Sequence, residues 1–375
     1  MKTLILSCRT GQGHDSCAEA IRQYYEAQGE VCITADGLTF ISERFSNFLS
    51  RGHVAMYRYF PWFFSCGYRY SEKHPRMFLE GAPVYRVLTS GTDRLHDYIA
   101  SEGFEAVICT HVFTGIMMTA LLKKYPMPLA TAFVATDYTC SPGVRESCLD
   151  RYYIASETLA DDYLCGSITK DKLRGVGIPL REDFYEKRDP VRDRQDFGIG
   201  EGHTHLVVMC GSMGCGPIKN LASVLTHLLP DNVELSIVCG TNRRLEKHLR
   251  RRFEGSDRIH IHGYVHNVAG LMNSADLYLT KPGGISTTEA AMKNLPMVLI
   301  DTVSGCETYN LRYFVSCGGA STDSHLPSLT QLTLRLARSP ETLAAMRRQL
   351  SSLPKDNAAA LIYHDMKTLK ESQAS

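Results

Sequence analysis

The chain lacks the features that mark several large classes of protein. Its 375 residues include one tryptophan and 13 scattered cysteines without a CxxC pair, which argues against a disulfide framework or a zinc site. No apolar run reaches the ~18 residues of a transmembrane helix. The formal net charge is only +1, so no global field indicates nucleic acid as a partner. The opening MKTLILSCRTGQGH does not resemble a signal peptide, because its apolar run is too short.

What the chain does contain is a regular alternation of short apolar runs with helical stretches. Near-continuous apolar strands separated by helices predict parallel sheets that are covered on both faces. We therefore predict an α/β protein of two Rossmann-like domains, 1–180 and 198–345, whose sheets face a central cleft, and a helical tail, 346–375, that could pack back on the first domain. The strand-like runs are 3–8, 31–37, 105–111, 129–137, 151–156, 204–212, 233–240, 258–265, 276–280 and 296–301.

A glycine-rich turn, CGSMGCGP (210–217), follows one strand-like run of the second half and precedes a helix. Gly211 and Gly214 allow the backbone to approach a ligand, Ser212 offers a hydroxyl, and the helix N-terminus suits a diphosphate. The alternative is an ordinary turn that uses glycine for sharpness. Neither a Walker lysine nor a dinucleotide spacing accompanies the turn, which argues against ATP hydrolysis and against NAD.

A second such turn, KPGGISTTEA (281–290), is more specific. Gly283 and Gly284 let backbone amides face a ligand, and the hydroxyls of residues 286–288 can cap the following helix and donate to phosphate or sugar oxygens. Glu289 could accept both hydroxyls of a ribose. The alternative is an acid that only favours the helix dipole.

Together these motifs, with HGYVHN and GCETYN, resemble the C-terminal half of glycosyltransferases of the GT-B fold. The branch is that of monogalactosyldiacylglycerol synthases and processive diacylglycerol glucosyltransferases, whose start GGGH-x-x-A-A-E-A is similar to GQGHDSCAEAI here. The resemblance covers about residues 3–320. It implies an inverting enzyme that moves a hexose from a UDP-sugar to diacylglycerol or a related lipid, peripheral on the cytoplasmic face of the cell membrane.

The resemblance also implies roles for individual residues of the second half. The Gly211–Gly214 loop would hold the diphosphate, and Glu289 the ribose. Cys306 stands where the family has glutamine, which leaves the hexose open. The remaining expected donor contacts are Tyr264 and Val265 at the uracil, Gly284, Ile285 and Ser286 at the α-phosphate, and Glu307 and Asn310 at the sugar hydroxyls.

In the first half, the resemblance implies that His14, which follows Gly13, lies at the cleft floor. Attack by an acceptor hydroxyl needs a base of near-neutral pKa, and imidazole suits this role. The alternative is a histidine that only positions a ligand. Asp137 is the second candidate, as base or as orienter of His14. His111 could line the acceptor site or be structural.

An aromatic segment, 40–79, holds Trp62, Phe63 and Phe64 among arginines. Aromatic residues interleaved with basic ones suit an anionic membrane surface, and the family admits its lipid acceptor here. The alternative is a helical lid packed on the core. The basic stretch RRLEKHLRRRF (243–253) is either a solvated face or a second membrane contact.

No DxD-type carboxylate pair is evident, so we expect metal-independent transfer without a cofactor. The expected partners are a UDP-hexose, diacylglycerol or another lipid, and an anionic membrane surface, but not nucleic acid. Two alternatives stay open. One is a UDP-N-acetylglucosamine 2-epimerase, which shares the fold, and the other is a non-catalytic relative that binds nucleotide or lipid.

Overall fold

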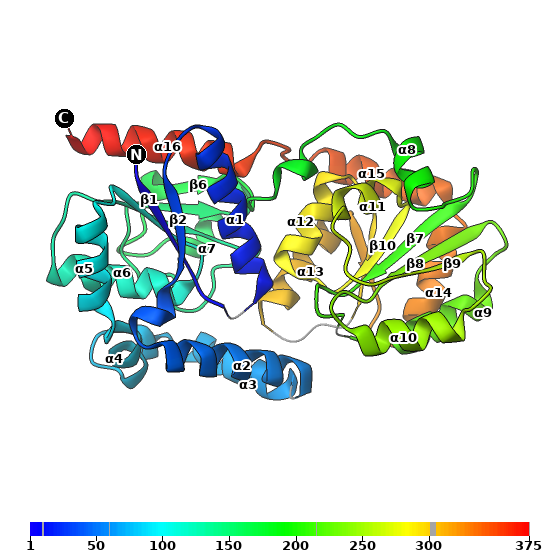
Figure 1. The fold of residues 1–375 in the computed structure, drawn as a ribbon, viewed down its shortest axis with the longest axis horizontal. Coiled ribbons are helices and arrows are strands. Elements are labelled where there is room, and N and C mark those ends of the chain that lie inside the picture. The colour runs from blue at the N-terminus through cyan, green and yellow to red at the C-terminus, as the bar shows by residue number, and fades with distance from the viewer. Residues whose placement is uncertain (10, 60, 215, 301–304, 375) are drawn as a thin grey trace. The chain divides into compact units, whose positions relative to one another are not determined.

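The computed structural model describes residues 1–9, 11–59, 61–214, 216–300 and 305–374, with the side chains of 51, 53–59, 61, 63, 64 and 374 also outside the description. The chain forms two compact units (Figure 1). Unit 1 comprises Met1–Glu182, Val303–Tyr309 and Asp356–Ser375. Unit 2 comprises Asp183–Thr302 and Asn310–Lys355.

Unit 1 is built on a parallel sheet of strand order β2-β1-β3-β4-β5-β6 within its described residues. Every residue of the central strands β1, β3 and β4 is buried, as expected where helices cover both faces of a sheet. The strands are β1 (Thr3–Ser7), β2 (Cys32–Asp36), β3 (Ala106–Cys109), β4 (Ala130–Val134), β5 (Arg151–Ile154) and β6 (Leu173–Gly175).

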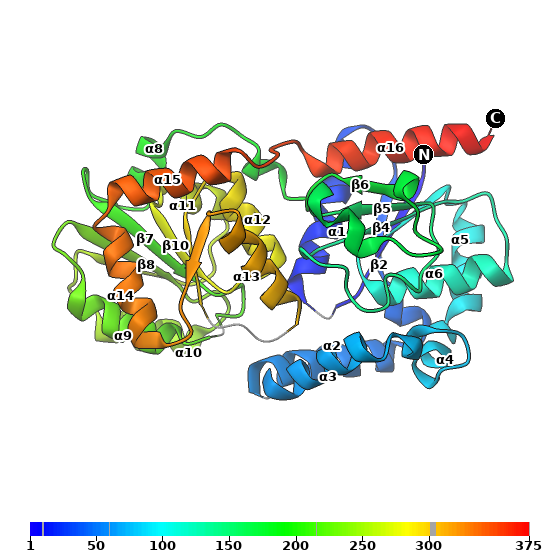
Figure 2. The ribbon, with the colours of Figure 1, turned by 180° about the vertical axis from the view of Figure 1, so that it is seen from behind.

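The last helix of the chain, α16, returns to unit 1 and packs against α1 (Figure 2). Its Tyr363 ring lies 5.0 Å from the ring of Tyr25, and its Asp365 accepts hydrogen bonds from Arg151 and Tyr153. The helices of this unit are α1 (Gln12–Ala27), α2 (Glu43–Tyr59), α3 (Pro61–Lys73), α4 (Pro83–Thr89), α5 (Thr92–Glu102), α6 (Val112–Lys124), α7 (Ala160–Tyr163) and α16 (Ala358–Ala374), with 3-10 turns η1 (Gly37–Phe40), η2 (Pro75–Phe78), η3 (Glu157–Leu159), η4 (Lys170–Lys172) and η5 (Glu182–Phe184).

Unit 2 repeats the plan, with the parallel order β12-β11-β10-β7-β8-β9 among its described residues. Its strands are β7 (Thr204–Met209), β8 (Val233–Val238), β9 (Ile259–His262), β10 (Leu277–Thr280), β11 (Met297–Leu299) and β12 (Ala320–Thr322). Its helices are α8 (Pro190–Asp196), α9 (Ile218–Leu228), α10 (Arg243–Arg252), α11 (Val268–Ser274), α12 (Gly284–Met292), α13 (Cys306–Ser316), which begins in the unit 1 segment, α14 (Leu326–Ala337) and α15 (Pro340–Ser351).

The predicted fold class is confirmed, since each unit holds a parallel sheet between helices. The sequence missed β6 and β12, the strands of three residues at one edge of each sheet. Strands this short carry too little apolar pattern to be recognised. Within the described residues, none of the helices combines the length and the apolar character that crossing a bilayer requires.

Candidate functional site

Three neighbouring strands of unit 1 end close to predicted site residues. His14 lies in the first turn of α1, directly after Gly13, and α1 follows β1. His111 follows β3, and Asp137 follows β4. Because parallel strands end at the same edge of a sheet, these side chains share one edge. The rings of His14 and His111 meet edge to face, with centroids 4.6 Å apart.

The hydrogen bonds of His14 define its tautomer. Its Nδ1 lies 2.7 Å from the carbonyl oxygen of Thr110. A carbonyl can only accept, so Nδ1 carries the proton and Nε2 keeps its lone pair. The Thr136 hydroxyl lies 3.1 Å from the same Nδ1. Burial lowers the pKa of His14 below 6.5, although the Thr110 carbonyl opposes the shift. A neutral imidazole with a basic Nε2 is the state that a general base requires.

His111 and Asp137 have other partners in this unit. The Nδ1 of His111 accepts a hydrogen bond of 3.1 Å from the amide of Phe113 and so caps α6. The carboxylate of Asp137 makes a hydrogen bond with the thiol of Cys306. Burial, together with the charge of Asp137, raises the pKa of that thiol. His111 therefore has a structural task, whatever else it does.

The aromatic segment forms α2 and α3 and exposes several large side chains. Trp62 is 65% exposed, and Phe48 and Tyr70 are 75% and 58% exposed. Phe63 and Phe64 belong to α3, but their side chains lie outside the described residues. The exposed rings fit the membrane interpretation better than a lid whose aromatic residues are all packed on the core.

In unit 2, the first glycine turn follows β7 and packs against the turn that follows β8. Gly211 and Gly214 have φ of 70° and 56°, a region that favours glycine. A Cβ on Gly214 would lie 2.1 Å from the carbonyl oxygen of Cys239, so no other residue fits without a shift. The side chain of Asn242 donates to the Gly214 carbonyl at 3.4 Å. Gly214 is therefore a packing requirement as well as a predicted ligand contact.

Further backbone bonds tie three strand ends together. The amide of Thr241 donates to the carbonyl of Ser212 at 2.8 Å, and the amide of Gly240 donates to the carbonyl of Gly263 at 3.1 Å. The turns after β7, β8 and β9 therefore hold one another at the carboxyl edge of the sheet. In the third turn, the predicted uracil contacts differ in burial, since Tyr264 is 55% exposed and Val265 is partly buried.

The second glycine turn opens α12. Gly283 has an extended backbone, and a Cβ placed there meets no atom within 4 Å. The helix begins without a side-chain cap, because its N-cap residue, Gly283, has no side chain. The hydroxyls of Thr287 and Thr288 donate instead to the carbonyls of Gly283 and Gly284, at 2.9 and 2.6 Å. The prediction that these hydroxyls cap the helix is wrong. An uncapped N-terminus still offers its amides to an anion.

Two of the other predicted residues of α12, Ser286 and Glu289, lie near Tyr278. The hydroxyl of Ser286 makes a hydrogen bond with this phenol, and Glu289 lies close enough that its charge adds to the burial that raises the pKa of Tyr278. Ser286, Ile285 and Glu289 are all partly buried. They lie within the first two turns of the helix.

Two further buried side chains, Asn310 and Lys281, belong to this part of unit 2. The fully buried Asn310 donates to the carbonyl of Pro282 at 2.9 Å, so its predicted sugar contact is accompanied by a structural one. Lys281 is 9% exposed, and a Cβ on Gly216 would lie 3.2 Å from its Cε. Sequence reasoning missed Lys281, although a lysine between a buried strand and PGG was a usable signal. Glu307 belongs to the segment that groups with unit 1.

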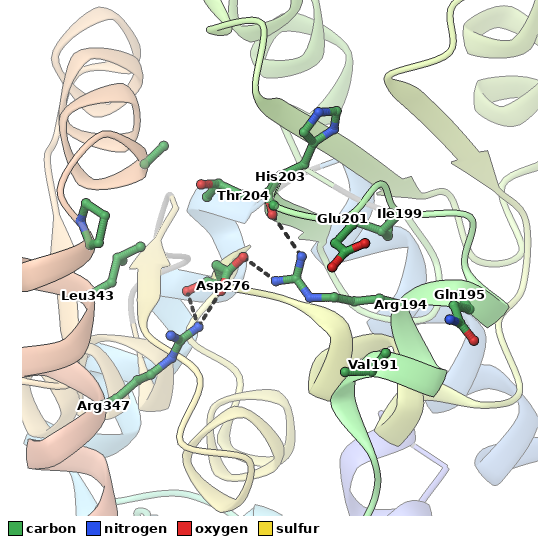
Figure 3. Close-up of a pocket in the computed structure, with 13 residues that line it drawn as sticks. Val191, Arg194, Gln195, Ile199, Glu201, His203, Thr204, Asp276, Leu343 and Arg347 are labelled. Atoms are coloured by element: carbon green, nitrogen blue, oxygen red, sulfur yellow. Dashed lines mark hydrogen bonds and ion pairs between the residues drawn. The ribbon is translucent and has the colours of Figure 1, made fainter.

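A cavity of about 490 Å³ lies at the opposite, amino-terminal edge of the unit 2 sheet (Figure 3). Thr204 begins β7 there, and Asp276 directly precedes β10. Asp276 accepts from Arg194 at 2.6 Å and from Arg347 at 2.7 Å (Figure 3). The carboxylate thus joins α8, β10 and α15. None of the predicted site residues lines this cavity, so it does not belong to the glycine turns.

Within the described residues, no group of three or more histidine, cysteine, aspartate and glutamate side chains could hold a metal ion. Metal independence stays a prediction, as does the expected cleft between the domains.

Comparison with known proteins assigns each half of the chain to a family model. The model described as monogalactosyldiacylglycerol (MGDG) synthase matches residues 14–180, and the glycosyltransferase family 28 C-terminal domain matches residues 205–362. The chain is 25% identical over 381 residues to the processive diacylglycerol beta-glucosyltransferase of Bacillus subtilis, over 99% of this chain and 96% of the relative.

Solved structures share the fold at low identity. MurG of Acinetobacter baumannii matches with a TM-score of 0.67 and 11% identity, over 98% of this chain and all of its own. The UDP-GlcNAc 2-epimerase of Neisseria meningitidis, solved with UDP-GlcNAc, matches with a TM-score of 0.62 and 14% identity, over 98% of this chain and all of its own. Since both classes of enzyme match, this likeness shows the fold alone.

Proposed function

Because this chain belongs to the GT-B glycosyltransferases, in the family of monogalactosyldiacylglycerol synthases and processive diacylglycerol glucosyltransferases, we propose that it transfers a hexose from a UDP-sugar to diacylglycerol or a related lipid. The observation that carries the mechanism is the tautomer of His14. Its Nδ1 is committed to the Thr110 carbonyl, which leaves Nε2 to take a proton. The alternative, a 2-epimerase, is not favoured, because the N-terminal half matches the synthase model.

The reaction is a single displacement. His14 Nε2 takes the proton of the acceptor hydroxyl as its oxygen bonds to the anomeric carbon, while the bond from that carbon to the UDP oxygen breaks. UDP-glucose is an α-glycoside, and the Bacillus subtilis relative is named a beta-glucosyltransferase. A β product from an α donor requires inversion, which one in-line displacement produces.

The leaving diphosphate needs positive charge or hydrogen-bond donors. We assign this role to the α12 N-terminus, to the Gly211–Gly214 turn and to Lys281, which is buried beside Gly216. These groups make a metal unnecessary for charge stabilisation. Transfer should therefore proceed at an unchanged rate after dialysis against EDTA, and a loss that Mg²⁺ or Mn²⁺ restores would contradict metal independence.

His14 is a better base than Asp137 for a structural reason. Asp137 already accepts a hydrogen bond from the thiol of Cys306. In His14, Nδ1 is bonded to the Thr110 carbonyl and Nε2 keeps its lone pair. Asp137 is then a group that orders the same edge of the sheet rather than the proton acceptor.

The acceptor is a lipid, so the enzyme must work at a bilayer. The exposed rings of Trp62 and Tyr70 on α3, and of Phe48 on α2, suit insertion at a membrane interface. We infer peripheral binding on the cytoplasmic leaflet, where anionic lipids add electrostatic attraction.

The test is transfer from UDP-glucose and from UDP-galactose, with and without diacylglycerol vesicles. Glycolipid formation with one of these donors supports the proposal, and the productive donor identifies the hexose. Epimerised free sugar, or UDP binding without any turnover, would instead establish one of the alternatives.

The base assignment has its own variant, His14→Gln, which removes the imidazole but keeps a polar side chain. We expect the transfer rate to fall by about 10²- to 10⁴-fold with UDP binding retained. The matched control is His227→Gln, on the exposed side of α9, which should transfer at the parental rate. An unimpaired His14→Gln enzyme would show that another group takes the proton.

A further inference from the structure

We propose that α10 is a second docking surface, on unit 2, for the phosphate headgroups of an anionic bilayer. This inference rests on the proposed function, since a lipid glycosyltransferase must meet a bilayer. It adds a contact that is separate from the aromatic helices α2 and α3 of unit 1 and that works by different physics.

The first argument is the concentration of charge. The ten residues of α10, RRLEKHLRRR, carry six of the 41 arginines and lysines and one of the 40 acids of the chain. The helix therefore has a charge of +5, and the rest of the chain, for a total of +1, has −4. The one acid, Glu246, pairs with Arg250 at 2.9 Å. A patch of this strength on an otherwise slightly acidic protein is not an effect of overall composition.

The second argument is the direction of the side chains. Leu249 is fully buried and Leu245 is partly buried in the core of unit 2. Arg243, Lys247 and Arg251, spaced four residues apart, fall on the opposite side of the helix and are all exposed. The helix thus presents a straight row of cations to solvent.

The row of cations suits binding to the headgroups of a lipid surface without insertion into its acyl chains. The apolar residues of α10 are already used in the core, so no apolar face remains for insertion into acyl chains. Attraction must then come from charge, which strengthens membrane binding by about fivefold for each basic residue near an anionic surface. It must also fall steeply with salt, because exposed charges are screened within a Debye length.

The experiment replaces the row by Arg243→Gln, Lys247→Gln and Arg251→Gln in the full chain. Binding is measured by co-sedimentation with vesicles of phosphatidylglycerol and phosphatidylcholine in equal parts. We expect the partition coefficient to fall on the order of a hundredfold at low salt. The difference from the parent should disappear at about 1 M salt, where the Debye length is about 3 Å.

The matched control removes the same charge elsewhere in unit 2, by Arg335→Gln, Arg338→Gln and Arg348→Gln, all exposed on or beside α14 and α15. It should bind vesicles as the parent does. Equal losses in the two triple variants would mean that only net charge matters, and the proposal would fail. It would also fail if the α10 variant kept its vesicle binding but lost affinity for a duplex RNA.

Transfer assays separate this inference from the proposed function. With diacylglycerol in neutral detergent micelles, the α10 variant should be as active as the parent, and with anionic vesicles it should be slower. If the parent forms no glycolipid but binds vesicles through α10, the docking surface is supported and the proposed reaction is contradicted. If the parent transfers the hexose and the α10 variant still binds vesicles fully, the docking surface is contradicted and the reaction is supported.

Discussion

Two histidines of unit 2, of which His205 is buried and His262 is partly buried, predict a loss of stability in mild acid. His205 in β7 is fully buried, with Nδ1 3.1 Å from the carbonyl of Ser274 and Nε2 2.8 Å from the hydroxyl of Ser236. Burial lowers its pKa from 6.5 to about 4. His262 in β9 reaches the same Ser236 hydroxyl at 3.3 Å, and burial, with the neighbouring His260, lowers its pKa to about 4.

The direction of the pH effect on stability follows from which state, folded or unfolded, binds protons at these histidines. Between pH 6.5 and about 4, the unfolded chain is protonated at these positions and the folded chain is not, so acid favours unfolding. Going from pH 7 to pH 5 should lower the free energy of unfolding by about 2 kcal/mol for each histidine, or about 4 kcal/mol for both. Glu234, held between His203 and His260, has a pKa below its usual 4.5, so its own contribution is lost only at more acidic pH.

The assay is hydrogen exchange of peptides that contain β7, β8 and β9, at pH 7 and pH 5, corrected for intrinsic exchange. The opening constant should rise about 30-fold for each histidine, the equivalent of about 2 kcal/mol. His205→Gln should retain about half of the pH effect, and the double variant with His262→Gln almost none. His227→Gln, on exposed α9, is the control and should retain all of it.

The reasoning is refuted if the parent loses less than about 1 kcal/mol between these pH values, given about 1.4 kcal/mol for each unit of pKa. It is also refuted if His205→Gln responds to pH as the parent does. A lower absolute stability of the variant is not informative, because only the pH dependence reports the protonation of His205.

Three substitutions in or beside the two glycine turns are expected to separate effects on UDP binding from effects on stability. Gly214→Ala places a methyl group 2.1 Å from the Cys239 carbonyl, so both the melting temperature and calorimetric UDP affinity should fall, the latter by tenfold or more (about 1.4 kcal/mol). Gly283→Ala meets no atom within 4 Å, so it should melt like the parent and weaken only UDP binding. Asn310→Ala leaves the buried Pro282 carbonyl without its donor, which should cost about 1–3 kcal/mol in urea unfolding and raise KM for the donor sugar.

Much of the fold was readable because the central strands are short, apolar and separated by helices. The runs at 3–8, 204–212 and 233–240 became β1, β7 and β8 with shorter ends. The edge strands β6 and β12 were missed because LRG and AST carry no recognisable period. Their pairing depends on the neighbouring strand, which only the folded structure provides.

The site could be predicted from the sequence only in part, because many of its contacts also depend on the folded structure. Gly214 could be found because a positive φ and a close backbone approach both demand glycine. The prediction for Thr287 and Thr288 was wrong, because a hydroxyl in a helix can donate either to a ligand or to the backbone carbonyl one turn earlier. Here both hydroxyls donate to backbone carbonyls. The contacts of His14 with Thr110 and Thr136 join residues about a hundred positions apart, and no local pattern predicts them.

In the first glycine turn, Gly211–Gly214, the proposed contacts to the diphosphate come from the backbone rather than from side chains. The carbonyls of Gly211 and Ser212 accept from the amides of Gly214 and Thr241. In a trans peptide, the N–H points opposite to the carbonyl of the preceding residue, so the amide of Ser212 is directed away from the amide of Gly214. Backbone amides of a turn of this kind can form a concavity that suits an anion. On the proposed function, the diphosphate would be held through the peptide planes that Gly211 and Gly214 permit, so we expect loss of the Ser212 hydroxyl to weaken UDP binding less than a Cβ on Gly214 does.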